Sequence, residues 1–201
     1  IDALDSKSLM IDSTEADAVE AALAAYPGRA IVNSINMENG RVKIDQVVPI
    51  VKKHGAAVVA LTIDDEIGMA KTHEEKLGVA KKIHDIVVGE YGLDPSALIF
   101  DALTFTLATG EDEYRESGKA TIEGIRLIKE NLPGVFTSLG VSKVSFGLAP
   151  PARATLNSVF LARAVEAGLD LAMINPTHNR PNPELAAAHT ALQHIQLENA
   201  F

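Results

Sequence analysis

The sequence predicts an α/β fold built from repeated strand–helix units. Short, nearly continuous apolar runs begin roughly 20 to 40 residues apart, which is the length of one such unit. Longer amphipathic stretches lie between these runs. Continuous apolar runs are typical of strands buried on both faces of a parallel sheet. No linker-like or low-complexity stretch divides the 201 residues, so we expect a single domain over residues 1–201.

Six apolar runs are the expected strands, and they are rich in isoleucine, valine, leucine and alanine. They cover residues 9–11, 30–32, 56–63, 97–100, 135–139 with a continuation to 146, and 169–174.

Amphipathic periodicity predicts helices between these strands. Thr72 and Glu75 have the spacing of a capping box, and Gly92 and Pro95 are expected to end the helix that follows. Because proline disrupts a helix interior, we expect Pro49 in or near the first turn of a helix that begins at residue 45 or 46. Further helices are expected over about 13–23, 114–132, 156–167, with Leu156, Val159, Phe160 and Ala167 on one buried face, and 184–195.

Two architectures accept this order of elements: an open doubly wound sheet, or part of an eight-unit TIM barrel. A complete barrel takes about 250 residues, so about six units in this chain would leave a barrel two strands short. No glycine-rich nucleotide fingerprint, complete P-loop or G-x-S-x-G elbow occurs in the sequence. These absences favour the partial barrel.

Composition restricts the possible partners. The net charge is −9, from 18 basic and 27 acidic residues, which argues against nucleic acid or an anionic membrane as a partner. The chain contains no cysteine, and the spacing of its six histidines resembles no metal site, so we expect no metal. No apolar run approaches the roughly 18 residues of a membrane span, and no signal peptide opens the sequence. We therefore expect a cytoplasmic protein.

Single polar residues follow the predicted strands and are the candidate site. In a parallel sheet or barrel, the carboxyl ends of the strands converge on one face, where ligands bind. Each residue alone is better explained as a loop starter or helix cap, but several together favour a site. The candidates are Asp12, Asn33, Asp101, Ser142, Lys143 and Asn175.

Carboxylates and carboxamides in such a site suit a heterocycle that offers ring N–H and amino donors, such as a pterin. A nucleotide phosphate does not fit, because glycine loops and arginine clusters are missing. A second acidic run, residues 64–66, follows the third predicted strand. For this run, a solvated loop and a role in lining the site are about equally favoured.

Several segments together resemble a known family. They are Leu-Met-Ile-Asp-Ser at 9–13, Ile-Val-Asn-Ser-Ile-Asn at 31–36, Gly-Ala-Ala-Val-Val at 55–59, Ile-Phe-Asp at 99–101, Leu-Gly-Val-Ser at 139–142, Val-Ser-Phe-Gly-Leu at 144–148 and Leu-Asn-Ser-Val-Phe-Leu at 156–161. In this order they resemble the folate-binding domain of cobalamin-dependent methionine synthase, one of the pterin-binding TIM barrels. The likeness extends from about residue 9 to residue 175.

The resemblance implies that Asp12, Asn33 and Asp101 contact a pterin at strand ends, and that Gly140 and Ser142 form the turn over which it lies. We add Asn175 for its place after a strand. The implied reaction transfers the methyl group of 5-methyltetrahydrofolate to cob(I)alamin, which such enzymes carry on a cobalamin-binding domain elsewhere. Asp101 and Lys143 are the candidate catalytic residues.

This chain also departs from the family. Lys143 stands where the family usually has asparagine, two strand–helix units and their pterin-binding residues are missing, and the sequence after Pro181 drifts. We therefore expect folate binding with poor methyl transfer, and homo-association through the open sheet edges. Two alternatives remain: a dihydropteroate-synthase-like enzyme, disfavoured because no basic cluster suits a pyrophosphate, and a non-catalytic barrel fragment.

Overall fold

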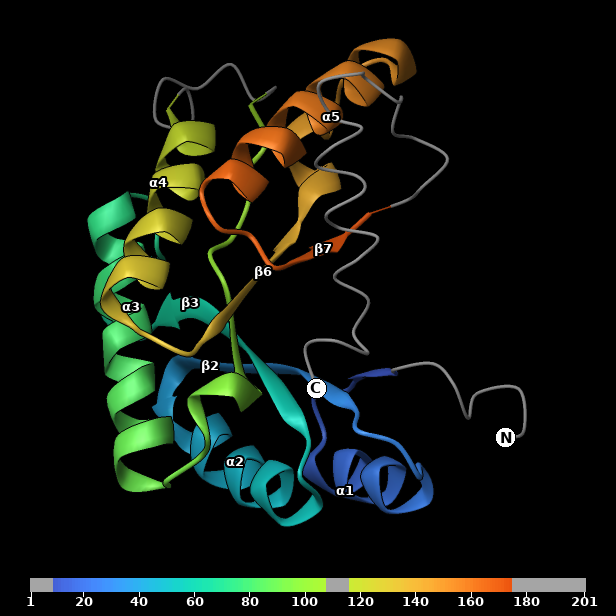
Figure 1. Ribbon diagram of the computed structural model, residues 1–201, viewed down its shortest axis with the longest axis vertical. Helices are drawn as coiled ribbons and strands as arrows, with labels where there is room; N and C mark the ends of the chain where they lie inside the picture. Colours follow the sequence, from blue (N-terminus) through green and yellow to red (C-terminus); the bar gives the residue numbers. More distant parts are fainter. Residues whose placement is uncertain (1–8, 108–115, 175–201) are drawn as a thin grey trace.

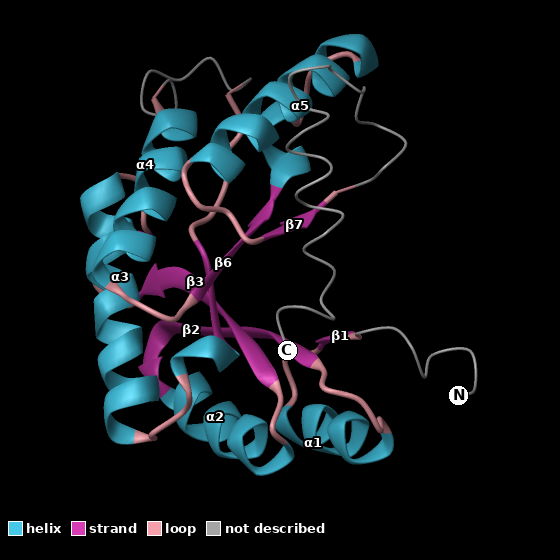
Figure 2. Cartoon of the chain, viewed as in Figure 1, coloured by secondary structure: helices cyan, strands magenta, loops and turns pink. Residues whose placement is uncertain are grey.

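The chain forms a curved parallel sheet whose helices lie along its outer side (Figures 1 and 2). The computed structural model describes residues 9–107 and 116–174. Six parallel strands pair in the order β1-β2-β3-β5-β6-β7, and a short strand, β4, pairs antiparallel with β3. Neighbours in the sheet therefore follow the order of the chain, as in a TIM barrel, whereas a doubly wound sheet reverses its strand order. The predicted partial barrel is confirmed.

The elements alternate as the sequence predicts. The strands are β1 Met10–Asp12, β2 Ile31–Arg41, β3 Ala57–Asp64, β4 Gly68–Met69, β5 Leu98–Asp101, β6 Phe136–Gly140 and β7 Leu171–Met173. The α-helices are α1 Ala16–Ala25, α2 Val42–His54, α3 His73–His84, α4 Ser117–Asn131 and α5 Pro150–Glu166. A π-helical turn, η1 Asp85–Glu90, extends α3, and two 3₁₀ turns are η2 Pro95–Ala97 and η4 Val141–Ser145. The expected helix over 184–195 lies outside the described residues.

Both faces of the sheet are apolar. On the outer face, residues such as Val58 and Phe100 pack under the helices in the main core, while Ile31, Val59 and Ile99 form a second cluster on the inner face. Successive strand residues point to opposite faces, so a strand buried on both faces must be apolar at every position. This requirement explains the continuous apolar runs in the sequence.

The predicted start of α2 is wrong. The helix begins at Val42, immediately after β2, and Pro49 lies inside it rather than in the first turn. Interior proline costs a helix about 3 kcal/mol. The buried stripe of this helix, which includes Ile44, Val47 and Val51, starts before the proline. Because burying these side chains offsets the cost of the proline, the helix continues through it.

The strand ends also differ from the prediction. The fifth predicted strand stops at Gly140 instead of continuing to Phe146, and the chain turns into η4. Arg153 holds this turn, because its guanidinium donates to the Ser142 carbonyl and to the Ser145 hydroxyl at 3.3 and 3.2 Å. β2 extends to Arg41, well beyond the predicted end at residue 32, and the apolar pattern missed its second half because that half is largely polar. The short strand β4 was not predicted.

One residue of the predicted core stripe of α5 is exposed. Val159 is 49% exposed, whereas Asn157, Phe160, Leu161 and Ala164 are buried. Residues at positions i, i+3, i+4 and i+7 share one helix face, and a residue at i+2 lies on the opposite face. The buried stripe therefore passes through a polar residue, Asn157, which the apolar pattern did not reveal.

The predicted capping box at α3 is confirmed. The Thr72 hydroxyl accepts from the Glu75 backbone N–H at 3.2 Å, and the Glu75 carboxylate accepts from the Thr72 N–H at 3.0 Å. These bonds satisfy donors that a helix start leaves unpaired. α3 consequently begins at a fixed position relative to the strand ends.

Replacing Thr72 with alanine removes one half of this box. We expect Thr72→Ala to lower the free energy of unfolding by about 1 kcal/mol, measured by urea denaturation. Thr72→Ser keeps the hydroxyl and serves as the control, with stability close to that of the wild type. Equal stability of the alanine and serine variants would contradict the assignment of the cap.

Candidate functional site

The register of the sheet brings the predicted residues to its inner face. Asp12 pairs with Asn33, Asp101 pairs with Ser138, and Gly140 pairs with Met173. Paired residues on parallel strands point to the same face. Following the register from strand to strand places all of them on the face of the inner apolar cluster, toward the carboxyl ends of the strands.

Asp101 is buried, with 6% of its surface exposed, whereas Asp12, the other acidic residue that follows a predicted strand directly, is exposed. Its Oδ1 atom accepts from the Leu103 backbone N–H at 2.8 Å. Its Oδ2 atom accepts no hydrogen bond from the described residues. Burial raises the pKa of Asp101 to about 6, although the Leu103 N–H and the charges of Lys143 and Lys76 oppose the shift. The carboxylate is thus buried and oriented by Leu103, and one of its two oxygen atoms has no hydrogen-bond donor among the described residues.

Gly140 leaves open space at the end of β6. A Cβ atom at this position would meet no atom within 4 Å. Beyond it, η4 turns the chain so that Ser142 is partly exposed and Lys143 is exposed. A flat ligand can therefore approach the backbone at Gly140 closely, as the predicted turn requires.

The loop after β5 is joined to the η4 turn. The Leu107 backbone N–H donates to the Val144 carbonyl at 3.0 Å, and the Thr106 hydroxyl donates to the Phe146 carbonyl at 2.7 Å. Phe146 itself is 69% exposed. These two segments together border one side of the inner face, next to Asp101 and Gly140.

The remaining candidates divide into three groups. Asp12 is exposed at the end of β1, and its register partner Asn33 is partly exposed, so both are accessible to a ligand. Asn33 does not follow its strand as predicted, because β2 continues to Arg41. Asp64, from the acidic run, is buried and accepts from the backbone of Glu66 and from Lys82 on α3, at 3.1 and 2.7 Å. This pattern is that of a loop cap and ion pair. Asn175 lies outside the described residues.

Sequence reasoning missed Ser138, which is 1% exposed and is the register partner of Asp101. Its hydroxyl has no hydrogen-bond partner within 9–107 and 116–174. A signal was present: residues 136, 138 and 140 share one face of the strand, so a small polar residue two positions before Gly140 must lie on the inner face. Ser138 adds a second polar group beside the Asp101 carboxylate.

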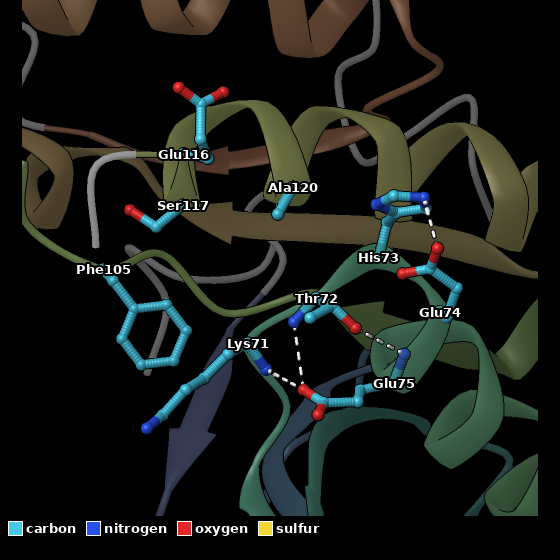
Figure 3. A pocket seen from close by; sticks show the side chains of 9 residues that line it. All are labelled: Lys71, Thr72, His73, Glu74, Glu75, Phe105, Glu116, Ser117 and Ala120. Carbon is cyan, nitrogen blue, oxygen red and sulfur yellow. Dashed lines mark hydrogen bonds and ion pairs between the residues drawn. The ribbon is translucent and has the colours of Figure 1, made fainter. Parts of the chain in front are cut away.

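A separate pocket of about 420 Å³ lies between the N-terminal ends of α3 and α4 (Figure 3). None of the predicted site residues lines it. The Glu75 carboxylate at its wall accepts from the backbone N–H groups of Lys71 and Thr72, and His73 pairs with Glu74 at 2.9 Å. Because these charged groups are already paired and none of the predicted site residues lines this pocket, we place the candidate site on the inner face of the sheet instead.

The sequence matches the family described as pterin binding enzymes over residues 1–175. This chain belongs to the pterin-binding enzyme family. It is 45% identical over 176 residues to the methionine synthases of Mycobacterium tuberculosis (strain ATCC 25618 / H37Rv) and Mycobacterium leprae (strain TN), with 86% of the chain covered. The chain spans only 15% and 14% of the length of these relatives. The predicted resemblance to the folate-binding domain of methionine synthase is confirmed.

Solved structures with a similar fold are dihydropteroate synthases. The Xanthomonas albilineans enzyme with 4-aminobenzoic acid has a TM-score of 0.62 at 15% identity, covering 94% of this chain and 67% of that one. The Thermus thermophilus enzyme in complex with 6HMPPP has a TM-score of 0.58 at 14% identity, covering 96% and 69%. At such low identity, these similarities establish the fold of this pterin-binding domain and nothing about its reaction.

Within residues 9–107 and 116–174, no helix combines the length and the apolar character that a membrane span requires. No group of three or more histidine or acidic side chains there is arranged to hold a metal ion.

The raised pKa of Asp101 has a consequence for the stability of this pterin-binding domain. An ordinary aspartate titrates at 3.8 and Asp101 in the fold at about 6. The folded state therefore binds the proton more tightly than the unfolded state, so the contribution of Asp101 to stability is fully present below about pH 4 and is lost as the pH rises through 6. Above pH 6, the charged carboxylate lowers the stability of the fold.

We expect Asp101→Asn, which keeps the acceptor for the Leu103 N–H, to raise the free energy of unfolding at pH 7.5 by about 1–2 kcal/mol. The gain is expected to shrink toward zero at pH 4.5. Urea denaturation at both pH values measures it. Asp12→Asn is the matched control at an exposed strand end and is expected to change stability by less than about 0.5 kcal/mol. A variant less stable than wild type at pH 7.5 would identify Asp101 as a purely structural cap.

Proposed function

We propose that this chain binds 5-methyltetrahydrofolate and presents its methyl group to cob(I)alamin carried on a cobalamin-binding domain. The observation that carries the proposal is the Asp101 carboxylate, which is buried on the inner face with its Oδ2 atom unoccupied by the described residues. The 45% identity to two methionine synthases supports this choice of ligand.

Asp101 has the chemistry to recognise the amidine-like edge of a pterin. That edge offers an amino group and a ring N–H, and an ionised carboxylate is an acceptor for both. Leu103 already fixes the plane of the carboxylate through Oδ1. A charge-assisted hydrogen bond in a desolvated site contributes about 1.5–3 kcal/mol, which repays the cost of holding this charge inside the protein.

The remaining contacts follow from the same face. Asn33 can both donate and accept, and Asp12 offers a further acceptor at the neighbouring strand end. The open space at Gly140 gives room for the flat ring beside the η4 turn, where Ser142 is partly exposed. We propose these four residues as ligand contacts together with Asp101, and we retain Asn175 as a proposal from the sequence alone.

The reaction requires a poor leaving group to depart. In the proposed transfer, the N–CH₃ bond of the folate would break with its electron pair left on the ring nitrogen, which would gain a proton, and the methyl group would pass to the cob(I)alamin substrate, which would supply the electron pair of the new bond. The nitrogen leaves more easily when a proton or a strong hydrogen bond stabilises it. The domain's contribution is to position the pterin and to support this change of charge.

Lys143 is the one predicted catalytic residue that opposes this chemistry. It lies close enough to Asp101 to lower the pKa of that carboxyl group. Positive charge builds on the folate nitrogen during activation, and two like charges about 4 Å apart repel by roughly 4 kcal/mol at an effective dielectric of 20. We therefore expect Lys143 to slow transfer rather than to act as the general acid.

Calorimetric titration tests the binding step. We expect Asp101→Asn to weaken 5-methyltetrahydrofolate binding about ten- to a hundredfold. Because the ionised form binds, wild-type affinity is expected to fall about tenfold for each pH unit below 6, whereas the Asn variant loses this dependence. No heat of binding to wild type at millimolar folate would favour a non-catalytic fragment.

A lysine-to-asparagine exchange tests the role of Lys143. We expect Lys143→Asn to raise the single-turnover rate of methyl transfer to cob(I)alamin at least about tenfold, because the fixed cation is removed. Lys119→Asn, at an exposed position on α4, is the control for a general loss of positive charge. A lower rate in the Lys143 variant would instead assign the general acid to this lysine.

A further inference from the structure

Lys76 has no exposed surface and is one of the largest fully buried side chains in the described chain. It comes from the first turns of α3, and its aliphatic stem passes between α3 and α4. A buried ammonium group is costly unless each of its N–H groups has a partner. This lysine needs an explanation that the folate contacts above do not supply.

Three carbonyl groups surround the Lys76 ammonium. Nζ donates to the Ala70 carbonyl at 2.9 Å, to Ala102 at 2.5 Å and to Leu103 at 3.3 Å. An ammonium group has three donors, so these carbonyls use all of them. Two of the three belong to the residues that directly follow Asp101, and the third precedes α3.

The segment held by Lys76 has an unusual backbone. Leu103 has a φ of 57°, in the left-handed region that residues with a side chain seldom adopt. Its N–H donates to Asp101, and its carbonyl accepts from both Lys76 and the Thr121 hydroxyl, the latter at 2.9 Å. The same residue that orients Asp101 is therefore held from behind by Lys76 and Thr121.

Space for the lysine is provided by a glycine on α4. A Cβ atom at Gly124 would lie 2.7 Å from Cδ of Lys76. Glycine in a helix interior costs roughly 1 kcal/mol relative to alanine. Glycine at position 124 therefore destabilises α4 slightly but leaves the room that the Lys76 side chain occupies.

We propose that Lys76 is a positioning residue, which fixes the loop after β5 so that the Asp101 carboxylate is held toward the ligand. This proposal rests on the proposed function for its ligand. Lys76 acts through Leu103 and does not touch the inner face itself, so it differs from the contact residues named above. Its positive charge also acts on Asp101, together with Lys143 from η4, and Glu75 acts in turn on Lys76.

Lys76→Met tests the proposal because it preserves the length of the side chain and removes the donors and the charge. In the free protein, we expect amide exchange at Leu103 to accelerate at least about tenfold. We also expect the NMR titration midpoint of the Asp101 carboxyl group to rise by about half a pH unit or more, since a nearby cation is lost. Lys143, the other cation that acts on Asp101, is retained in this variant, so a shift of the midpoint reports the loss of Lys76.

Thr121→Val is the matched control, since it removes the other donor to the Leu103 carbonyl without changing charge. It is expected to accelerate exchange at Leu103 and to leave the Asp101 midpoint within about 0.2 pH units. Should Lys76→Met fail to fold, Gly124→Ala takes its place, because the added methyl group displaces the lysine stem and is expected to change both readouts in the same direction.

Folate affinity is measured separately. We expect Lys76→Met to weaken 5-methyltetrahydrofolate binding about tenfold at pH 7.5. Failure of the wild type to bind folate would overturn the proposed function, while the exchange and titration results in the free protein would still decide the role of Lys76. Unchanged Leu103 exchange and an unchanged Asp101 midpoint, together with a lower melting temperature, would reduce Lys76 to a structural lysine and overturn the proposal.

Discussion

A buried ammonium group must find an acceptor for each of its hydrogens, and the region around Asp101 is organised by that constraint. Lys76 meets it with three main-chain carbonyls, two of which belong to the loop after β5. This loop then adopts a conformation that its own residues do not favour, with Leu103 in the left-handed region. The orientation of Asp101 is thus a product of packing between α3, α4 and β5.

Asp101, the proposed binding residue, illustrates how a group suited to a ligand can reduce the stability of a fold. Its neighbours include two cations and a backbone N–H that favour the charged form, yet burial dominates and its pKa is raised. In the proposed complex, a ligand with two N–H donors provides hydrogen bonds that the described residues do not give to the Asp101 carboxylate. The free energy that the empty site loses by burying this charge then contributes to the affinity for the ligand.

The sequence was informative wherever a local pattern determined the structure. Continuous apolar runs identified the parallel strands, and the Thr72–Glu75 spacing located the start of α3. The predicted end of a strand is also correct at Asp101, whereas Asn33 lies within β2 because the strand continues to Arg41. Long-range packing determined the rest. Pro49 stays inside α2 because buried residues on both sides of it hold the helix. In the sequence, Lys76 resembles any helix lysine, and only the packing of α4 against α3 shows that it is buried. Ser138 was missed because a serine inside an apolar strand carries no signal without knowledge of its register partner.

Side chains and main-chain hydrogen bonds together hold the border of the inner face beside Asp101 and Gly140, and none of the bonds described for it uses the side chain of Lys143. The Leu107 N–H meets the Val144 carbonyl, and within the η4 turn the Phe146 N–H meets the Lys143 carbonyl, at 3.0 and 3.1 Å. Main-chain bonds of this kind persist when side chains are exchanged. A substitution at position 143 therefore leaves the hydrogen bonds of this border in place, and the charge next to the proposed binding face can change without a change in the backbone that forms its edge.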